Sequence, residues 1–134
     1  MTLVAELVGI VESPRYLQAA CSRRLPDTTA SLLAEYRAWR TRHAQVLDAV
    51  ARQAERASAR ARREGSRVSM ADLSAAGAQV MRDRMDGLGE AQAREICRQY
   101  SELLRDKDVA MAESVPRRLA VIEAADRERS ASEP

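Results

Sequence analysis

The apolar residues of this chain recur with the spacing of α-helices. In the longest such stretch they are three or four residues apart, which places them on one face of one helix. These positions are Leu32, Leu33, Tyr36, Trp39, His43, Val46, Leu47, Val50, Ala54, Ala57 and Ala61. They predict a helix from about Thr29 to Glu64, ended by Gly65. At about 1.5 Å per residue it would be on the order of 54 Å long, so it either overhangs its neighbours or kinks.

Proline and serine mark an earlier helix. Ser13 followed by Pro14 has the pattern of an N-cap and a first helical position, and Pro26 closes the segment. Residues 2–12, which come before it, are expected to form a further helical turn or two, or an extended arm. The pattern therefore predicts a short amphipathic helix ahead of the long one.

The second half of the chain is divided in the same way. Ser69 and Asp72 have the spacing of a capping box, which predicts a helix from there to about Asp86. Gly87 and Gly89 then break the chain. Two more helices are predicted, from Glu90 to about Arg105 and from Ser114 onward, and the polar tail at about residues 127–134 is expected to fray.

Composition supports an all-α fold. Hydrophobic residues make up 46% of the 134 residues, but aromatics are only 3% and Phe is absent. A sheet favours β-branched and aromatic residues, whereas small and unbranched side chains suit helix-on-helix packing. We therefore expect an all-α, antiparallel bundle of four to five helices with one long central helix, forming a single domain over residues 1–134.

Four residues are expected in the core of this bundle. Trp39, the only tryptophan, lies on the long apolar face, and Ile96 and Tyr100 lie on the inward face of the fourth helix. Gly77 lies on the apolar side of the third helix, where it costs about 1 kcal/mol of helix propensity relative to Ala. A bulky neighbour would explain it, so we predict that Gly77 is the seat of Trp39.

The two cysteines, Cys21 and Cys97, each lie on an apolar helix face. They are either two buried thiols or a disulfide between the first and fourth helices. A bridge closing a loop of about 77 residues would contribute roughly 4–5 kcal/mol in the chain-entropy model. It would also indicate a periplasmic or secreted protein whose leader has been removed, and a cytoplasmic location is the alternative.

Charge is distributed unevenly along the chain, whose net charge is +2. Residues 1–67 carry 12 Arg against 7 acidic residues, a net charge of +5; residues 68–134 carry 9 Arg and Lys107 against 13 acidic residues, a net charge of −3. Arg52, Arg56, Arg60 and Arg63 recur along one side of the long helix, as in a helix that follows phosphates. The near-neutral total and the absence of interleaved aromatics make nucleic acid an unlikely partner, and a solvated face is the simpler interpretation.

No motif predicts catalysis, a metal or a cofactor. The single His and two Cys lack the spacing of zinc ligands, and "DGLGE" lacks the spacing of a phosphate-binding loop. A hydrolase would need His43 as its base, but His43 lies on the apolar face and no nucleophile motif accompanies it. The most apolar stretch, residues 3–11, is too short to span a membrane, which takes about 20 residues.

The run from Cys21 to His43, "CSRRLPDTTASLLAEYRAWRTRH", resembles the opening of some small exported, mostly uncharacterised α-helical proteins of proteobacteria. In those proteins a similar cysteine begins a disulfide and a Tyr/Trp/Arg helix follows. The resemblance covers about 25 of the 134 residues. It implies an exported helical protein and implies no activity.

These observations favour a non-catalytic helical protein that binds another protein, such as an inhibitor or immunity-type protein of the bacterial envelope. The alternatives are a structural or assembly factor of the envelope, a cytoplasmic adaptor or nucleic-acid-associated protein that uses the arginines, and an enzyme centred on His43. A homo-oligomer formed through the long helix is a further expectation. The candidate contact residues are Tyr36, Arg40, His43, Arg52, Arg56, Arg60 and Arg63.

Overall fold

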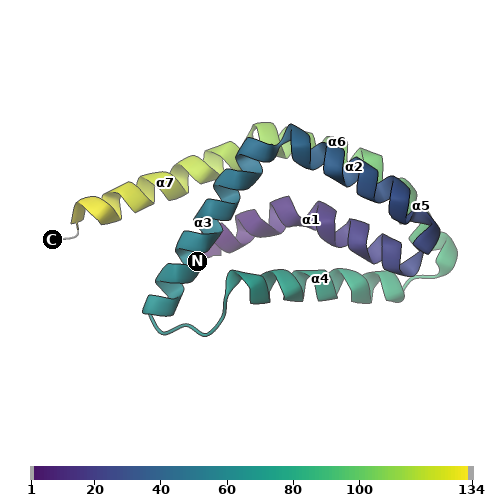
Figure 1. The fold of residues 1–134 in the computed structure, drawn as a ribbon, viewed down its shortest axis with the longest axis horizontal. Helices are drawn as coiled ribbons and strands as arrows, with labels where there is room; N and C mark the ends of the chain where they lie inside the picture. Colours follow the sequence, from purple (N-terminus) through teal and green to yellow (C-terminus); the bar gives the residue numbers. More distant parts are fainter. Residues whose placement is uncertain (1, 133–134) are drawn as a thin grey trace.

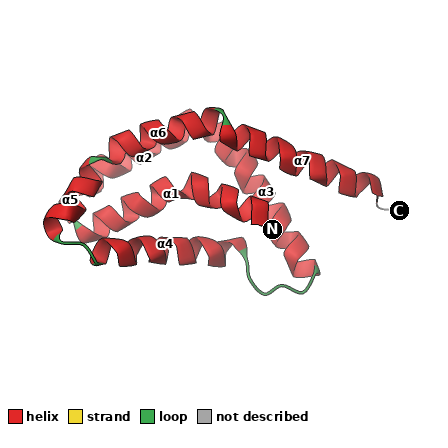
Figure 2. Ribbon diagram, turned by 180° about the vertical axis from the view of Figure 1, so that it is seen from behind, coloured by secondary structure: helices red, strands yellow, loops and turns green. Residues whose placement is uncertain are grey.

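The computed structural model describes residues 2–132, and this part of the chain is helical without any strand (Figure 2). The all-α prediction is confirmed. The elements in chain order are α1 (Thr2–Arg24), the short 3-10 helix η1 (Pro26–Thr28), α2 (Thr29–Arg42), α3 (Ala44–Arg63), α4 (Met70–Asp86), α5 (Glu90–Arg98), α6 (Tyr100–Ala112) and α7 (Ser114–Ser132).

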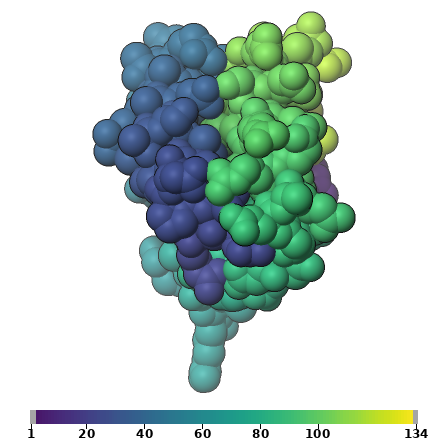
Figure 3. All heavy atoms as spheres, turned by 90° about the vertical axis from the view of Figure 1, so that its right-hand side faces the viewer, coloured from purple at the N-terminus to yellow at the C-terminus, as the bar shows by residue number. Residues whose placement is uncertain are grey.

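The helices are arranged around α1, which contacts every other helix. Helix α4 lies alongside α1, while α2 and α6 run together over its other side (Figure 1). Seen from the end of the molecule, α2 and the α5–α6 segment meet along one seam (Figure 3). The central helix is therefore α1, and the segment predicted as the long central helix forms part of the cover.

Ser13 is not an N-cap, because α1 continues through it from Thr2. Pro14 lacks the N–H that would bond the Ile10 carbonyl, and the Ser13 hydroxyl donates to that carbonyl instead, at 3.1 Å. The Tyr100 hydroxyl of α6 donates to the Pro14 carbonyl at 2.6 Å. Pro14 is fully buried, so a residue that resembles a helix start lies in the core of a bent helix.

The predicted helix from Thr29 to Glu64 is broken at His43, so the kink and not the overhang is observed. Neither proline nor glycine causes the break. Thr41 donates its side-chain hydroxyl to the Arg37 carbonyl one turn earlier, at 3.1 Å, a bond that bends helices. The His43 side chain is bound by Asp108 of α6, which holds the chain at the bend.

Of the other predicted helix boundaries, some are confirmed and others are wrong. Ser69 and Asp72 form the predicted capping box at the start of α4. The fourth helix is divided at Gln99 into α5 and α6. Residues 127–132 are helical and not frayed, because α7 continues to Ser132; residues 133–134 lie outside the described part of the chain.

Trp39 and Tyr100 are core residues as predicted, with 0% and 1% of their surface exposed. Ile96 is not, since 38% of it is exposed. The inward face of α5 is formed by Ala93 and Cys97, one turn apart, and Ile96 lies next to that face. The core of α5 is thus made of small residues.

Gly77 does seat an aromatic ring, but the ring belongs to Tyr16 of α1 and not to Trp39. A Cβ atom at Gly77 would lie 2.9 Å from Tyr16 Cε2, closer than carbon atoms pack. The prediction therefore identified the reason for the glycine and the wrong partner. Trp39 instead packs against Tyr36, whose ring stacks on it at a centroid distance of 6.3 Å, and against His43, whose ring is tilted by 59° at 5.2 Å.

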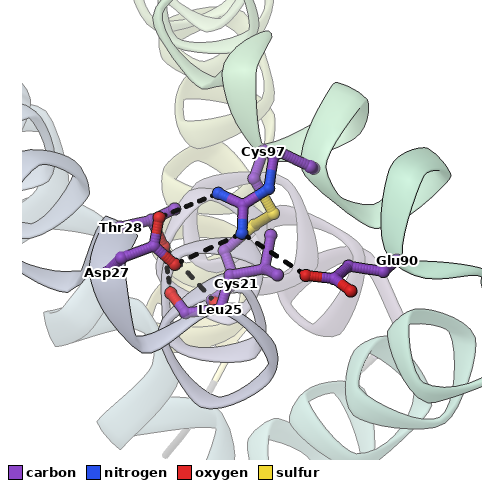
Figure 4. A network of polar contacts seen from close by, with 7 residues as sticks. Cys21, Leu25, Asp27, Thr28, Glu90 and Cys97 are labelled. Carbon is purple, nitrogen blue, oxygen red and sulfur yellow. Dashed lines mark hydrogen bonds and ion pairs between the residues drawn. A yellow bond between two sulfur atoms is a disulfide. The ribbon is translucent and has the colours of Figure 1, made fainter.

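Cys21 and Cys97 form a disulfide, the second of the two alternatives that the sequence left open, with Cα atoms 5.9 Å apart. It joins α1 to α5 across 76 residues of sequence, and both residues are buried. An exposed ion pair lies beside it: Arg94 Nη1 is 2.8 Å from Asp27 Oδ2, and Arg94 Nη2 is 3.7 Å from Glu90 Oε1 (Figure 4). The hydrogen bond from Arg94 holds the pKa of Asp27 below its ordinary value.

Candidate protein-binding groove

Helices α3 and α7 diverge from the top of the bundle, and α7 extends away from the other helices (Figure 1). Three adjoining hollows of about 470, 510 and 300 Å³ lie between the two helices and the start of α1. We call this surface the α3/α7 groove. Its lining residues are Leu3, Val4, Ala49, Arg52, Gln53, Arg56, Ala57, Ala59, Arg60, Arg63, Ile122, Glu123, Ala125, Asp126, Arg127, Arg129 and Ser130.

The smallest of the three hollows, beside the start of α1, has an apolar floor. Val4, Ala57 and Ile122 come from three different helices and are each less than 9% exposed. Leu3 stands at the edge of this floor with 53% of its surface exposed. Alanines at the contact face of α3 leave this space open, because a larger residue at Ala57 would fill it. The floor can therefore accept an apolar side chain from outside.

The walls are basic because of the register of α3. Arg52, Arg56, Arg60 and Arg63 follow one another by four, four and three residues, which keeps them on one side of the helix. The structure places all four at the α3/α7 groove.

Asp126 of α7 fixes two of the arginines in the groove. Its Oδ1 atom accepts hydrogen bonds from Arg60 Nη2 and Arg129 Nη2, each at 3.0 Å. Its Oδ2 atom is buried and has no partner among the described residues. Arg56 and Arg63 form no ion pair within residues 2–132, so their guanidinium groups are available to an anion from outside.

The other predicted contact residues lie elsewhere, at the α2–α3 junction, and they are largely occupied. Tyr36 is only 7% exposed, and its hydroxyl accepts a hydrogen bond from Arg40 Nη1 at 3.2 Å. His43 Nε2 lies 2.5 Å from Asp108 Oδ1, and the His43 ring packs on Trp39. The break at His43 separates this cluster from the α3/α7 groove, so the predicted contact residues form two sites.

Arg42 lies close to the His43–Asp108 pair. Burial raises the pKa of the Asp108 carboxyl, but the hydrogen bond with His43 and the charge of Arg42, 3.5 Å away, outweigh it and hold that pKa below its ordinary value. The pair ties the α2–α3 junction to α6. Its imidazole packs against Trp39 and faces a carboxylate at the helix bend.

Several residues of the groove were not predicted from the sequence, among them Asp126, Arg129, Leu3 and Val4. Asp126 and Arg129 follow Ile122 by four and seven residues, which continues the inward face of α7. That spacing was a usable signal for a longer helix. Leu3 and Val4 had no such signal, because only the fold brings the start of α1 beneath α3.

Within the described residues, no group of three or more His, Cys, Asp or Glu side chains could hold a metal ion. None of the helices combines the length and the apolar character needed to cross a membrane. Comparison of the chain with protein-family models, with curated proteins and with solved structures gave no match.

Proposed function

We propose that this protein acts by binding another protein, and that the α3/α7 groove is the binding site. The observation that carries the proposal is the union of an apolar floor with arginines that lack carboxylate partners. Val4, Ala57 and Ile122 line one hollow of the groove together with Arg60 and Arg129, and Arg56 and Arg63 line the adjoining hollow. The segment that fits is an amphipathic helix with an apolar face and acidic flanks.

The shape of the site supports this partner. Two diverging helices above an apolar floor resemble the grooves in which other proteins hold an amphipathic helix. Arginine at the rim of such a groove is a frequent hot-spot residue, because its planar guanidinium can bind a carboxylate with two hydrogen bonds. Arg60 and Arg129 are already oriented by Asp126, so little side-chain freedom is lost on binding.

The disulfide supports a location outside the cytoplasm, because such bonds persist in oxidising compartments. We infer an exported protein of the bacterial envelope, of the inhibitor, immunity or assembly class. That class is an analogy with other small helical bundles.

A nucleic-acid partner is less well supported. Trp39 and the three tyrosines, Tyr16, Tyr36 and Tyr100, are each 7% exposed or less. Single-stranded nucleic acids are held by aromatic side chains on which bases stack, and these rings are not available for stacking. The apolar floor of the α3/α7 groove also has no counterpart in a phosphate backbone.

The test is a fluorescence anisotropy titration with a synthetic peptide. The probe is a helical peptide of about 20 residues with Leu at helix spacing on one face and Glu beside it, and the reference peptide carries Lys in place of Glu. We expect saturable binding of the acidic peptide and none of the basic one. Arg56→Glu combined with Arg63→Glu should weaken binding at least tenfold, about 1.4 kcal/mol.

The matched control combines Arg37→Glu with Arg82→Glu, two exposed arginines on α2 and α4 outside the groove. It makes the same charge change and should leave the affinity within about twofold. Equal loss in both double variants would show a general charge effect and would refute the groove. Binding of a DNA duplex that exceeds binding of the acidic peptide would favour the nucleic-acid alternative.

A further inference from the structure

Helix α6 carries an acidic stripe on its outer face. Glu102, Asp106, Val109 and Glu113 are spaced by four, three and four residues, which aligns them along one side of the helix and its C-cap. All four are exposed, and Val109, at 61%, is the most exposed large hydrophobic residue of the described chain. We call these four residues the α6 stripe.

The carboxylates of the α6 stripe are uncompensated within the molecule. None of Glu102, Asp106 and Glu113 forms an ion pair with a residue in the range 2–132, although Arg105 adjoins the stripe. The α6 stripe therefore combines three carboxylates that have no ion pair in this range with one exposed valine.

The charge of the α6 stripe is opposite to that of the α3/α7 groove. The groove carries six arginines against Glu123 and Asp126, an excess of four positive charges, and one of its hollows has an apolar floor. The α6 stripe offers three negative charges around one apolar side chain, on a regular helix. The residues of the stripe are exposed in the folded chain, so the stripe does not occupy the groove of its own molecule.

We propose that the α6 stripe of one copy of this protein binds in the α3/α7 groove of a second copy. Val109 would enter above Val4, Ala57 and Ile122, and the three carboxylates would pair with groove arginines. This inference rests on the proposed function, because it names an occupant for the same groove. The two surfaces differ, so the contact is head-to-tail, and a chain or ring of copies can grow from it.

The test is sedimentation of the full chain over a range of concentrations at low and high salt. We expect the average mass to rise with concentration from the monomer value of 14.8 kDa to at least twice that value. Added salt should reverse the rise, because the contact relies on exposed charges. A chain that stays monomeric at high concentration and low salt would overturn the inference.

Charge reversal identifies the surfaces. Arg56→Glu with Arg63→Glu reverses charge in the groove and should abolish its binding. Glu102→Arg with Glu113→Arg does the same for the stripe. Each double variant alone should remain monomeric, while an equimolar mixture should associate, since one supplies an intact stripe and the other an intact groove. The control, Arg37→Glu with Arg82→Glu, should associate like the unmodified chain. A mixture that stays monomeric, or a control that fails to associate, would contradict the proposal.

The same samples separate this inference from the proposed function. If the acidic peptide binds the groove while the chain remains monomeric, only self-association is overturned. If the chain associates and the double variant at Arg56 and Arg63 associates equally well, the copies meet elsewhere and the inference also fails. Circular dichroism of each variant, matched to the unmodified chain, confirms that every sample is folded.

Discussion

Burial of Trp39 indicates whether its aromatic cluster belongs to the core or to a contact surface. The sequence places Tyr36, Trp39 and His43 on one helix face, and the structure buries the tryptophan completely. Tyr36 and His43 flank it and are themselves bound to Arg40 and Asp108. The aromatic cluster is therefore a packing centre at the α2–α3 junction, and most of its polar groups are already satisfied.

We predict that Trp39→Ala lowers the free energy of unfolding by about 3–5 kcal/mol, because it leaves a cavity in a tightly packed site. Trp39→Phe should cost less, since the indole N–H has no partner among the described residues and only volume is lost. Urea denaturation of both variants measures this. A phenylalanine as costly as alanine would show that the N–H is bonded after all.

Gly77 provides a second prediction at this scale. Ala would improve helix propensity by about 1 kcal/mol, but its Cβ would meet the Tyr16 ring at 2.9 Å, and overpacking typically costs about 1–3 kcal/mol. We expect Gly77→Ala to destabilise the protein by roughly 1 kcal/mol. In a Tyr16→Leu background the same change should be neutral or stabilising, as thermal unfolding of the four proteins would show. Destabilisation of equal size in both backgrounds would exclude the clash.

Asp108 predicts a pH dependence. Its pKa is lowered in the folded state, so its contribution to stability is fully present above about pH 4, the ordinary range for Asp, and is lost as pH falls through the lowered value. Asp108→Asn should therefore be less stable than the unmodified chain at neutral pH and equally stable near pH 2. Asp106→Asn, two residues earlier and on another side of α6, is the control. A stability difference that persists unchanged at acid pH would contradict this role.

At the scale of the helices, the sequence predicts best where the signal is local. The capping box at Ser69 and Asp72 needs only four consecutive residues, and it was predicted correctly. The break at His43 combines a local bond, from Thr41 to the Arg37 carbonyl, with a contact to Asp108, 65 residues later, which no local pattern predicts. Pro14 misled for the same reason: its place inside α1 is stabilised by Tyr100, which is 86 residues away.

In the candidate site, too, only the features with a local sequence signal could be predicted. The register of Arg52 to Arg63 is local, so the basic side of α3 could be predicted. The apolar floor could not, because Val4, Ala57 and Ile122 meet only after α1, α3 and α7 have packed. Ile96 shows the limit of periodicity, since the neighbouring Ala93 and Cys97 define an inward face that excludes it.

The disulfide is the strongest link between elements. Replacing both Cys21 and Cys97 by Ala should lower the free energy of unfolding by about 4–5 kcal/mol, because the unfolded chain regains the freedom of a loop of 76 residues. Guanidinium denaturation of the variant, beside the unmodified chain in its reduced and oxidised forms, measures this loss. Equal stability of the oxidised and reduced unmodified chain would contradict it.

Limited proteolysis checks the bridge itself. Residues 64–68 between α3 and α4 are exposed, with Arg63 and Arg67 at their ends, so trypsin should cut there first. The two fragments should remain one species under non-reducing conditions and separate when the disulfide is reduced. Separation without a reductant would show that Cys21 and Cys97 are not joined.

At the scale of the whole molecule, the bend at His43 and the extension of α7 have a common consequence. Helix α2 runs toward the top of the bundle, whereas α3 turns downward after the bend and crosses the start of α1 (Figure 1), and a hollowed space lies between α3 and α7. The arginines of α3 line that space. The architecture thus converts a basic helix face into the wall of a groove.

The central claim is that the α3/α7 groove, and not the α2–α3 junction, binds the partner. Amide chemical-shift mapping during titration with the acidic amphipathic peptide tests it most directly, because it reports every helix at once. The account predicts that shifts concentrate at residues 52–63 of α3 and 122–130 of α7. Shifts concentrated around Tyr36, Arg40 and His43, or none that saturate, would contradict it.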